Sequence, residues 1–140
     1  MKFLQIAILM LISCVGSLSA ENYQERDALL LAHELETSFW LQVQNQNEPV
    51  YARAISTIFQ GSGPTGTLSR DQYLQILNQA VVNEFALKHI IATKNKDIMV
   101  VTYEFTYKGL GILSGEKLSV WKHSRQGWKL VSHSFSALAP

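Results

Sequence analysis

The sequence contains few residues that could cross-link the chain or interrupt its secondary structure. Of its 140 residues, one is cysteine and three are proline, and charged residues make up only 16%. A single cysteine excludes an intrachain disulfide and a zinc site built from several cysteines. The formal net charge of +1 is far from the basic balance typical of nucleic-acid-binding domains, so no nucleic-acid partner is expected. The hydrophobic content of 47% and the length indicate one globular domain.

Long apolar runs are also absent, except near the amino terminus. A short positive start, Met1-Lys2, precedes a nearly unbroken apolar stretch at 3–12 and small residues up to Ala20. This order is typical of a secretory signal peptide, and the apolar run is about half as long as the ~20 residues that span a bilayer. We therefore expect a signal peptide at 1–20, cleaved after Ser19 or Ala20, and a single exported domain at 21–140, periplasmic or secreted. A buried amino-terminal helix is the alternative.

The only cysteine lies inside this segment and allows a second interpretation. Leu11-Ile12-Ser13-Cys14 resembles the lipobox of bacterial lipoproteins, in which the cysteine becomes the lipidated first residue, although the preceding segment is short for that class. A lipid on Cys14 would tether the protein to a membrane without a membrane span. The alternative localisation is therefore a membrane-tethered lipoprotein.

Charge is unevenly distributed along the domain. Residues 21–60 contain six acids and two bases, whereas residues 61–140 contain nine bases and five acids. A helical layer set against a strand layer would explain this division without a charged partner.

Helical periodicity dominates the first part of the domain. Residues 22–46 contain neither glycine nor proline, and apolar residues recur there at helical spacing. One face carries Ala28, Leu31, Ala32, Leu35, Phe39 and Gln42, and a second face carries Leu29, His33, Glu36 and Trp40. The helix should end before Pro49. One or two helical turns at 50–54, a short buried strand at 55–59 and a glycine-rich loop at 60–67 are expected next. Ser69 with Gln72 forms a capping-box pattern that predicts a helix at 70–80.

After Val81 the period of the apolar residues changes to two, which predicts strands. The expected strands lie at 85–92, 98–107, 118–123 and 128–135, with turns at 95–97 and 124–127 and a loop at 109–115. Turns this short favour antiparallel hairpins. Because the helices precede the strands, the predicted fold class is α+β, with helices covering one face of an antiparallel sheet.

Motifs that carry chemistry are weak. Gly61-x-Gly63-x-x-Gly66 matches the dinucleotide fingerprint as a string, but no crossover helices follow the later strands, so a glycine-rich turn is expected instead. The histidines, at positions 33, 89, 123 and 133, form no ligand pair, and neither a metal nor a cofactor is expected. His89 alternates with Phe85, Leu87 and Ile91. It is therefore predicted to point into the core or a cavity, where a neutral imidazole could act as an acid or a base.

Several segments together resemble a known family. They are Phe39-Trp40, Ile58-Phe59 with Gly66, Ser69-Arg70-Asp71-Gln72-Tyr73-Leu74, Ile98-Met99-Val100-Val101-Thr102-Tyr103, Ser119-Val120-Trp121-Lys122 and Gln126-Gly127-Trp128-Lys129-Leu130-Val131-Ser132-His133-Ser134. In their order and spacing they resemble the SnoaL-like or ketosteroid-isomerase-like branch of the nuclear transport factor 2-like superfamily. The resemblance implies a cone-shaped α+β fold, in which a curved antiparallel sheet wraps around a long amino-terminal helix and leaves an apolar cavity. It also implies a homodimer formed through the outer face of the sheet.

The resemblance does not fix a function, because the superfamily contains both enzymes and binding domains. Its enzymes usually place an aspartate in the cavity, but Asp27, Asp71 and Asp97 are expected at a helix start, after an N-cap and in a turn. We therefore expect a non-catalytic exported module that binds an apolar small molecule or a partner protein. The expected pocket residues are Phe39, Phe59, Tyr73, His89, Tyr103 and Trp121. The alternative is a small enzyme of the isomerase, dehydratase or cyclase type that acts on a lipophilic substrate with His89 and Tyr103.

Overall fold

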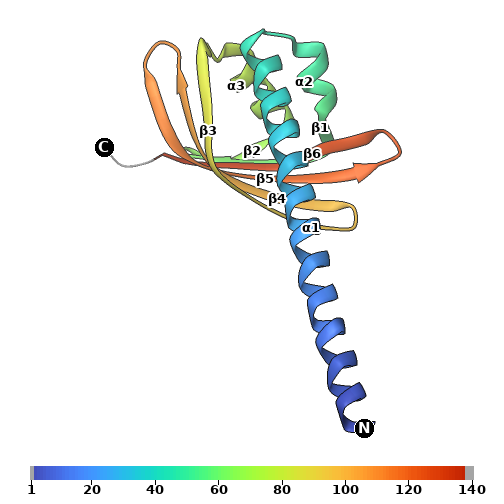
Figure 1. Ribbon diagram of the computed structural model, residues 1–140. Helices are drawn as coiled ribbons and strands as arrows, with labels where there is room; N and C mark the ends of the chain where they lie inside the picture. The colour runs from blue at the N-terminus through green and yellow to red at the C-terminus, as the bar shows by residue number, and fades with distance from the viewer. Residues whose placement is uncertain (1, 138–140) are drawn as a thin grey trace.

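The helices cover one face of a curved, open sheet, as the α+β prediction required (Figure 1). The computed structural model describes the backbone of residues 2–137 and the side chains of residues 22–137. In chain order, the elements are α1 (Lys2–Gln44), α2 (Glu48–Ala54), β1 (Ile55–Gly63), β2 (Gly66–Ser69), α3 (Arg70–Gln79), β3 (Glu84–Asn95), β4 (Ile98–Lys108), β5 (Ile112–Ser124) and β6 (Gly127–Ala137).

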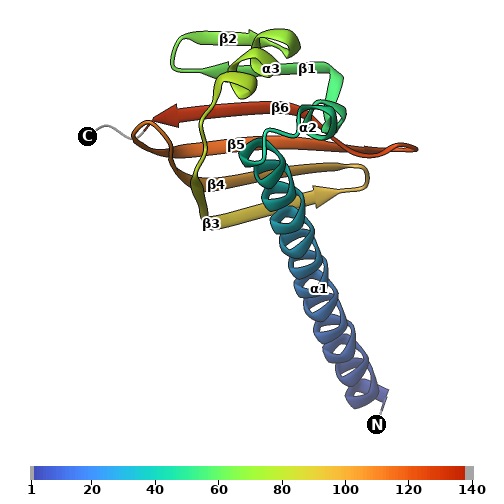
Figure 2. The same ribbon diagram turned by 90° about the horizontal axis from the view of Figure 1, so that it is seen from above.

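The sheet has six strands in the order β2-β1-β6-β5-β4-β3 (Figure 2). The four strands β3 to β6 form the antiparallel meander that the short turns predicted. Strands β1 and β2 add an antiparallel hairpin, and β1 pairs with β6 in parallel. The last strand of the chain therefore lies inside the sheet, between the first strand and the meander.

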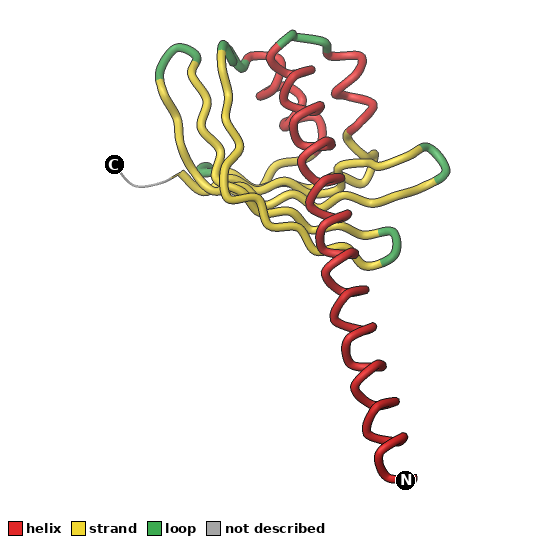
Figure 3. Tube along the Cα trace, in the orientation of Figure 1, coloured by secondary structure: helices red, strands yellow, loops and turns green. Residues whose placement is uncertain are grey.

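Helix α1 begins at Lys2, far before the expected start at residue 22, and its first half extends away from the sheet (Figure 3). Its second half buries one stripe of side chains at spacings of three or four residues: Ala28, Ala32, Glu36, Phe39, Trp40 and Val43. The predicted cleavage positions and Cys14 lie outside the residues whose side chains are described. Within the described part of the chain, no helix has the length and apolar character needed to cross a membrane.

Helix α3 begins where the capping-box pattern predicted. The Ser69 hydroxyl accepts a hydrogen bond from the Gln72 amide at 3.3 Å, and the Gln72 side chain accepts one from the Ser69 amide at 2.8 Å. Two backbone donors that the helix leaves without partners are thereby satisfied.

The expected glycine-rich loop at 60–67 and the expected loop at 109–115 are both shorter than predicted. Strand β1 continues through Gly61 to Gly63, which pairs with Gly66 in a tight hairpin, and Gly66 has the positive φ of 116° that favours glycine. Strand β5 begins at Ile112 and includes Gly115. A Cβ atom on Gly115 would lie 2.3 Å from the Ser136 carbonyl oxygen, so a glycine allows β5 and β6 to approach closely there. Glycine is required at these positions by sheet geometry, which composition alone does not distinguish from a loop.

Two irregularities change which residues face the helices. In β3, the pairing register with β4 shifts between Lys88 and Ile91, and His89 there has a positive φ of 52°. In β6, the register shifts around Val131, because Leu130 opposes Trp121 whereas Ser132 opposes Val120. An extra residue in one strand reverses the alternation of side chains beyond it.

Candidate functional site

Helix α1 places a carboxylate in the centre of the core. The Glu36 side chain is fully buried, with a relative exposure of 0%. Its Oε1 accepts a hydrogen bond from Trp121 Nε1 at 2.8 Å, and its Oε2 accepts one from the Tyr103 hydroxyl at 2.7 Å. Donors on both oxygens compensate a carboxylate for its loss of water.

The hydrogen bonds continue from Tyr103 towards helix α3. Trp40 Nε1 donates to the Tyr103 hydroxyl oxygen at 3.0 Å, and His133 Nε2 lies 3.4 Å from the same oxygen. The hydroxyl of Tyr73 is hydrogen-bonded to Nδ1 of His133. We name these six side chains the Glu36 cluster: Glu36, Trp40, Tyr73, Tyr103, Trp121 and His133. Since the Tyr103 hydroxyl donates to Glu36, the arrangement assigns the imidazole proton to Nε2 and makes Nδ1 an acceptor.

Burial sets the protonation of this cluster. It raises the pKa of Glu36, whereas the hydrogen bonds from Trp121 and Tyr103 oppose that rise. Burial and the charge of Glu36 raise the pKa values of Tyr73 and Tyr103 well above the ordinary tyrosine value. Burial, with the nearby Lys117, lowers the pKa of His133 well below that of free histidine. At neutral pH, both tyrosines therefore keep their protons and the imidazole is uncharged.

Lys117 lies beside the cluster on the inner face of β5. Its Nζ is 4.8 Å from the centroid of the Trp40 ring, 5.0 Å from that of Phe105 and 4.5 Å from that of Phe135. Its residue exposure is 9%, and it forms no salt bridge with another described residue. Burial lowers the pKa of Lys117 to about 7, although the charge of Glu36 acts in the opposite direction.

An apolar pocket of about 230 Å³, here called the inner pocket, borders this lysine. The pocket lies between helix α3, the β1–β2 hairpin and the inner face of the sheet. Its apolar wall consists of Pro64, Leu68, Ile76, Ala80, Val82, Leu113 and Phe135, and its polar or aromatic part includes Trp40, Tyr73, Tyr107, Lys117 and His133. A mostly apolar wall with a few convergent polar groups is the usual composition of a small-molecule site.

The structure separates the residues that were predicted to form one pocket. Tyr73 borders the inner pocket. Phe39, Phe59 and Trp121 are buried in the core, where Phe39 contacts the edge of the Trp121 ring and Phe59 stacks on Tyr73. Tyr103 supplies the central hydroxyl of the Glu36 cluster.

The predicted inward orientation of His89 is wrong. Its side chain is 80% exposed, and its Nε2 lies 3.7 Å from Glu104 Oε2 on the outer face of the sheet. His89 borders an open outer hollow of about 730 Å³ instead, whose lining also includes Tyr103 and Lys117. The register shift in β3 turns the side chain outward, so the alternation that begins at Phe85 does not continue through position 89.

Glu36, Lys117 and His133 were not recognised as site residues from the sequence. A signal for Glu36 existed, because it lies four residues after Ala32 and four before Trp40, on the buried stripe of α1. Lys117 alternates with Ser119 and Trp121, but its position fell between the predicted loop at 109–115 and the predicted strand. No signal identified His133, because the register shift in β6 determines its direction.

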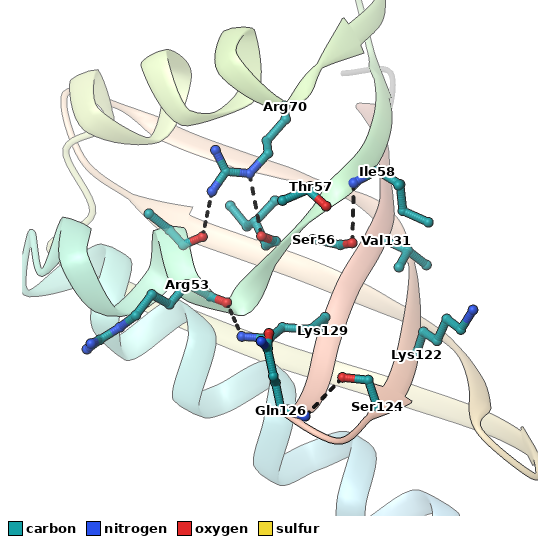
Figure 4. A pocket seen from close by; sticks show the side chains of 12 residues that line it. Arg53, Ser56, Thr57, Ile58, Arg70, Lys122, Ser124, Gln126, Lys129 and Val131 are labelled. Carbon is teal, nitrogen blue, oxygen red and sulfur yellow. Dashed lines mark hydrogen bonds between the residues drawn. The ribbon is translucent and has the colours of Figure 1, made fainter.

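A basic hollow of about 500 Å³ lies on another part of the surface, lined in part by Arg53, Arg70, Lys122 and Lys129 (Figure 4). Arg70 Nη2 donates to the Ala52 carbonyl at 2.9 Å, and Lys129 donates to the Arg53 carbonyl. Cations are favourable at the carboxyl end of a helix, where carbonyl groups lack partners. Two of these four bases therefore stabilise the end of α2. No group of three metal-ligating side chains occurs among the residues that the structure describes.

No protein-family model matches the sequence, and a search of curated proteins gave no match. Solved structures do match. A nuclear transport factor 2-like protein from Cytophaga hutchinsonii is 20% identical and superposes with a TM-score of 0.71, over 81% of this chain and 98% of that one. A nuclear transport factor 2-like protein of unknown function in nutrient uptake, from Rhodospirillum rubrum, is 14% identical with a TM-score of 0.70, over 75% and 96% of the two chains.

A candidate ketosteroid isomerase from Parabacteroides distasonis is also similar in structure. It is 13% identical and superposes with a TM-score of 0.64, over 76% of this chain and 85% of that one. Identities this low establish the fold and no activity. Together with the order of the strands and the long helix on the inner face of the sheet, these similarities show that the chain has the nuclear transport factor 2-like fold, as its sequence motifs indicated.

Proposed function

We propose that this protein is an exported, non-catalytic module that binds an apolar small molecule in the inner pocket. The observation that carries the proposal is the pocket itself, whose apolar wall faces the side chains of Tyr73, Lys117 and His133. Its volume of about 230 Å³ gives room for about eight water-sized groups at ~30 Å³ each, enough for a short alkyl chain or one aromatic ring. The fold of the matching structures is consistent with this use.

The Glu36 cluster supports the proposal by fixing one side of the pocket. Each of its side chains is buried and hydrogen-bonded, and its members come from α1, α3, β4, β5 and β6. Satisfied polar networks of this kind rigidify the residues they connect. A pocket with a rigid side loses less entropy when it binds a ligand.

The enzyme alternative required His89 and Tyr103 to act together. The His89 imidazole is exposed beside Glu104, whereas the Tyr103 hydroxyl is buried against Glu36. The two residues border the same outer hollow, but the Tyr103 hydroxyl donates to Glu36, and no hydrogen bond joins it to His89 among the described residues. Binding is therefore the better-supported function.

Calorimetric titration with 1-heptanol, which has eight non-hydrogen atoms, tests the proposal. The wild-type protein should bind it saturably, and Leu113→Trp, which places an indole at the pocket wall, should weaken binding about ten-fold or more, or about 1.4 kcal/mol. Ile112→Trp is the matched control, because Ile112 is the preceding residue and does not line the pocket. Equal affinities of the two variants would overturn the proposed site. If the wild-type protein binds no heptanol, a partner protein becomes the favoured ligand.

Export is the second part of the proposal and has its own measurement. Intact-mass analysis of the protein purified from its native cells should give a chain that starts at Ala20 or Glu21. A chain that starts at a lipidated Cys14 would establish the membrane-tethered alternative. A chain that retains Met1 would contradict both forms of export.

A further inference from the structure

Lys117 is a buried lysine at a position in β5 where the sheet does not need a charged side chain. Among the described residues that line the inner pocket, it is the one lysine or arginine. The exposed lysines of the strands lie on the surface, whereas Lys117 is almost fully buried on the inner face of β5, between Ser119 and Gly115. An apolar side chain of similar length would fill this position without the cost of burying an amine.

Three aromatic rings surround the amine. Trp40, Phe105 and Phe135 each have their ring centroid within 5.0 Å of Nζ, and no described carboxylate forms an ion pair with it. Glu36 influences Lys117 from a greater distance, but both Glu36 oxygens already accept hydrogen bonds from Trp121 and Tyr103. The faces of the three rings attract a cation. The rings also exclude the water that an ammonium ion prefers, and this exclusion favours the uncharged amine.

These surroundings keep a large share of the amine unprotonated. Burial lowers the pKa of Lys117 to about 7, so about half of the molecules hold a free amine at neutral pH. An ordinary lysine, with a pKa of about 10.4, holds less than about a thousandth of its population in that form. A desolvated lysine in an apolar pocket is the usual form of a nucleophilic amine that attacks carbonyl groups.

We propose that Lys117 captures the carbonyl group of an apolar aldehyde or ketone as a Schiff base, with the apolar part of the molecule against the wall of the inner pocket. This inference rests on the proposed function, because the pocket must first admit the molecule. The ligand is then an apolar carbonyl compound, and the bond between it and the protein is covalent and reversible.

The step needs no further reactant. The Nζ lone pair attacks the carbonyl carbon, a C–N bond forms, the π bond of the carbonyl group breaks, and one proton passes from the nitrogen to the oxygen. The tetrahedral carbinolamine then loses its hydroxyl group together with the second N–H proton as water while the C=N bond forms. Amine and carbonyl thus become imine and one water molecule without oxidation or reduction. A protonated imine carries a positive charge, which the three ring faces stabilise as they do the ammonium ion.

Reductive trapping tests the inference directly. The wild-type protein is incubated at pH 7 with heptanal and sodium cyanoborohydride, which converts an imine into a stable secondary amine, and the modified lysines are identified by peptide mass mapping. We expect Lys117 to gain a heptyl group about ten-fold faster or more than Lys122, an exposed lysine on the same strand. An excess of 1-heptanol should protect Lys117 and leave the labelling of Lys122 unchanged.

Matched variants complete the experiment. Lys117→Met removes the amine and keeps an unbranched apolar chain, so heptanal should modify the remaining lysines only slowly, and circular dichroism should verify its fold. Lys122→Met should leave the labelling of Lys117 unchanged, and Leu113→Trp should slow it. If heptanol binds in the inner pocket but heptanal modifies Lys117 no faster than Lys122, the Schiff base is wrong and the proposed function stands. If neither compound enters the pocket, both proposals fail.

Discussion

Glu36 shows how a single residue determines the polarity of the core. Its carboxylate accepts hydrogen bonds from Trp121 and Tyr103, and Tyr103 in turn accepts one from Trp40. Removing an acceptor from such a group leaves donors buried without partners, which costs more than the bond itself contributes. The buried donors of Trp121 and Tyr103 therefore require a carboxylate at position 36.

The first prediction concerns this carboxylate. Glu36→Ala should lower the free energy of unfolding by about 3–5 kcal/mol, because it leaves the Trp121 and Tyr103 donors unpaired and opens a cavity. Urea denaturation measures the change. Glu34→Ala is the control, because Glu34 is exposed on the same helix, and its effect should stay within about 0.5 kcal/mol. Similar losses for both variants would contradict the role assigned to Glu36.

The second prediction concerns the pH dependence that Lys117 produces. In the folded protein the pKa of Lys117 is lowered to about 7, whereas the unfolded chain has the ordinary lysine value. Between these values the unfolded chain binds more protons, so the free energy of unfolding should rise as the pH rises from 7 towards 9.5. Below pH 7 the amine is protonated in both the folded and the unfolded chain, so Lys117 no longer changes the stability with pH. The raised pKa of Glu36 has the opposite effect: stability falls as the pH rises from the ordinary glutamate pKa to the raised pKa of the folded protein.

Lys117→Met isolates this contribution. The variant should be more stable than the wild type at pH 7, and its stability should rise less between pH 7 and 9.5. Denaturant titrations at several pH values measure both effects. An unchanged slope in the variant would show that Lys117 titrates as an ordinary surface lysine.

At the scale of the elements, the two register shifts explain both the main error and the main omission of the sequence interpretation. Strict alternation from Phe85 predicts that His89 points inward, and strict alternation from Leu130 places His133 on the outer face. One extra residue in β3 and one in β6 reverse both orientations. A bulge has a weak local signal, since it depends on the pairing of two strands that are distant in the sequence. The histidine of the site therefore could not be identified from periodicity.

Features with a local cause were predicted more accurately. The capping box of Ser69 and Gln72 fixed the start of α3 because its hydrogen bonds lie within four residues. The meander was predictable because its turns are short. The parallel pairing of β1 with β6 was not predictable, because no local sequence feature specifies which distant strand pairs with β6 beside the meander.

The third prediction concerns the close approach of β5 and β6. Gly115→Ala should destabilise the protein by about 1–3 kcal/mol, because its Cβ would lie 2.3 Å from the Ser136 carbonyl oxygen and 2.5 Å from the Phe135 ring. Thermal unfolding measures the loss. Gly111→Ala is the matched control, because a Cβ at Gly111 meets no atom within 4 Å. A stability loss at Gly111 as large as that at Gly115 would contradict this explanation.

At the scale of the whole molecule, the outer face of the sheet carries exposed apolar side chains. Ile91 is 67% exposed, and Val100 and Leu118 are each 37% exposed, on the adjacent strands β3, β4 and β5. We propose that this face forms the homodimer that the family resemblance implies, because apolar surface on a sheet face favours association.

The fourth prediction tests this dimer. Sedimentation equilibrium should give twice the mass of one chain, and Leu118→Lys should shift the population towards the monomer by placing a charge in the interface. Leu110→Lys is the control, because Leu110 is 98% exposed in the turn between β4 and β5 and lies off this face. A wild-type protein that remains monomeric at high concentration would refute the proposal.

The position of β6 has a consequence for how the protein is made. This strand is the last in the chain, yet it pairs with β1 and β5 and carries His133 and Leu130 into the core. The sheet therefore cannot be completed until the residues of β6 are available, and the β1–β6 pairing joins segments about half the chain apart. Contacts this distant slow folding, because a long loop must close before they form. A chain that emerges from the ribosome amino terminus first therefore leaves β1 without its neighbour β6 until the residues of β6 emerge.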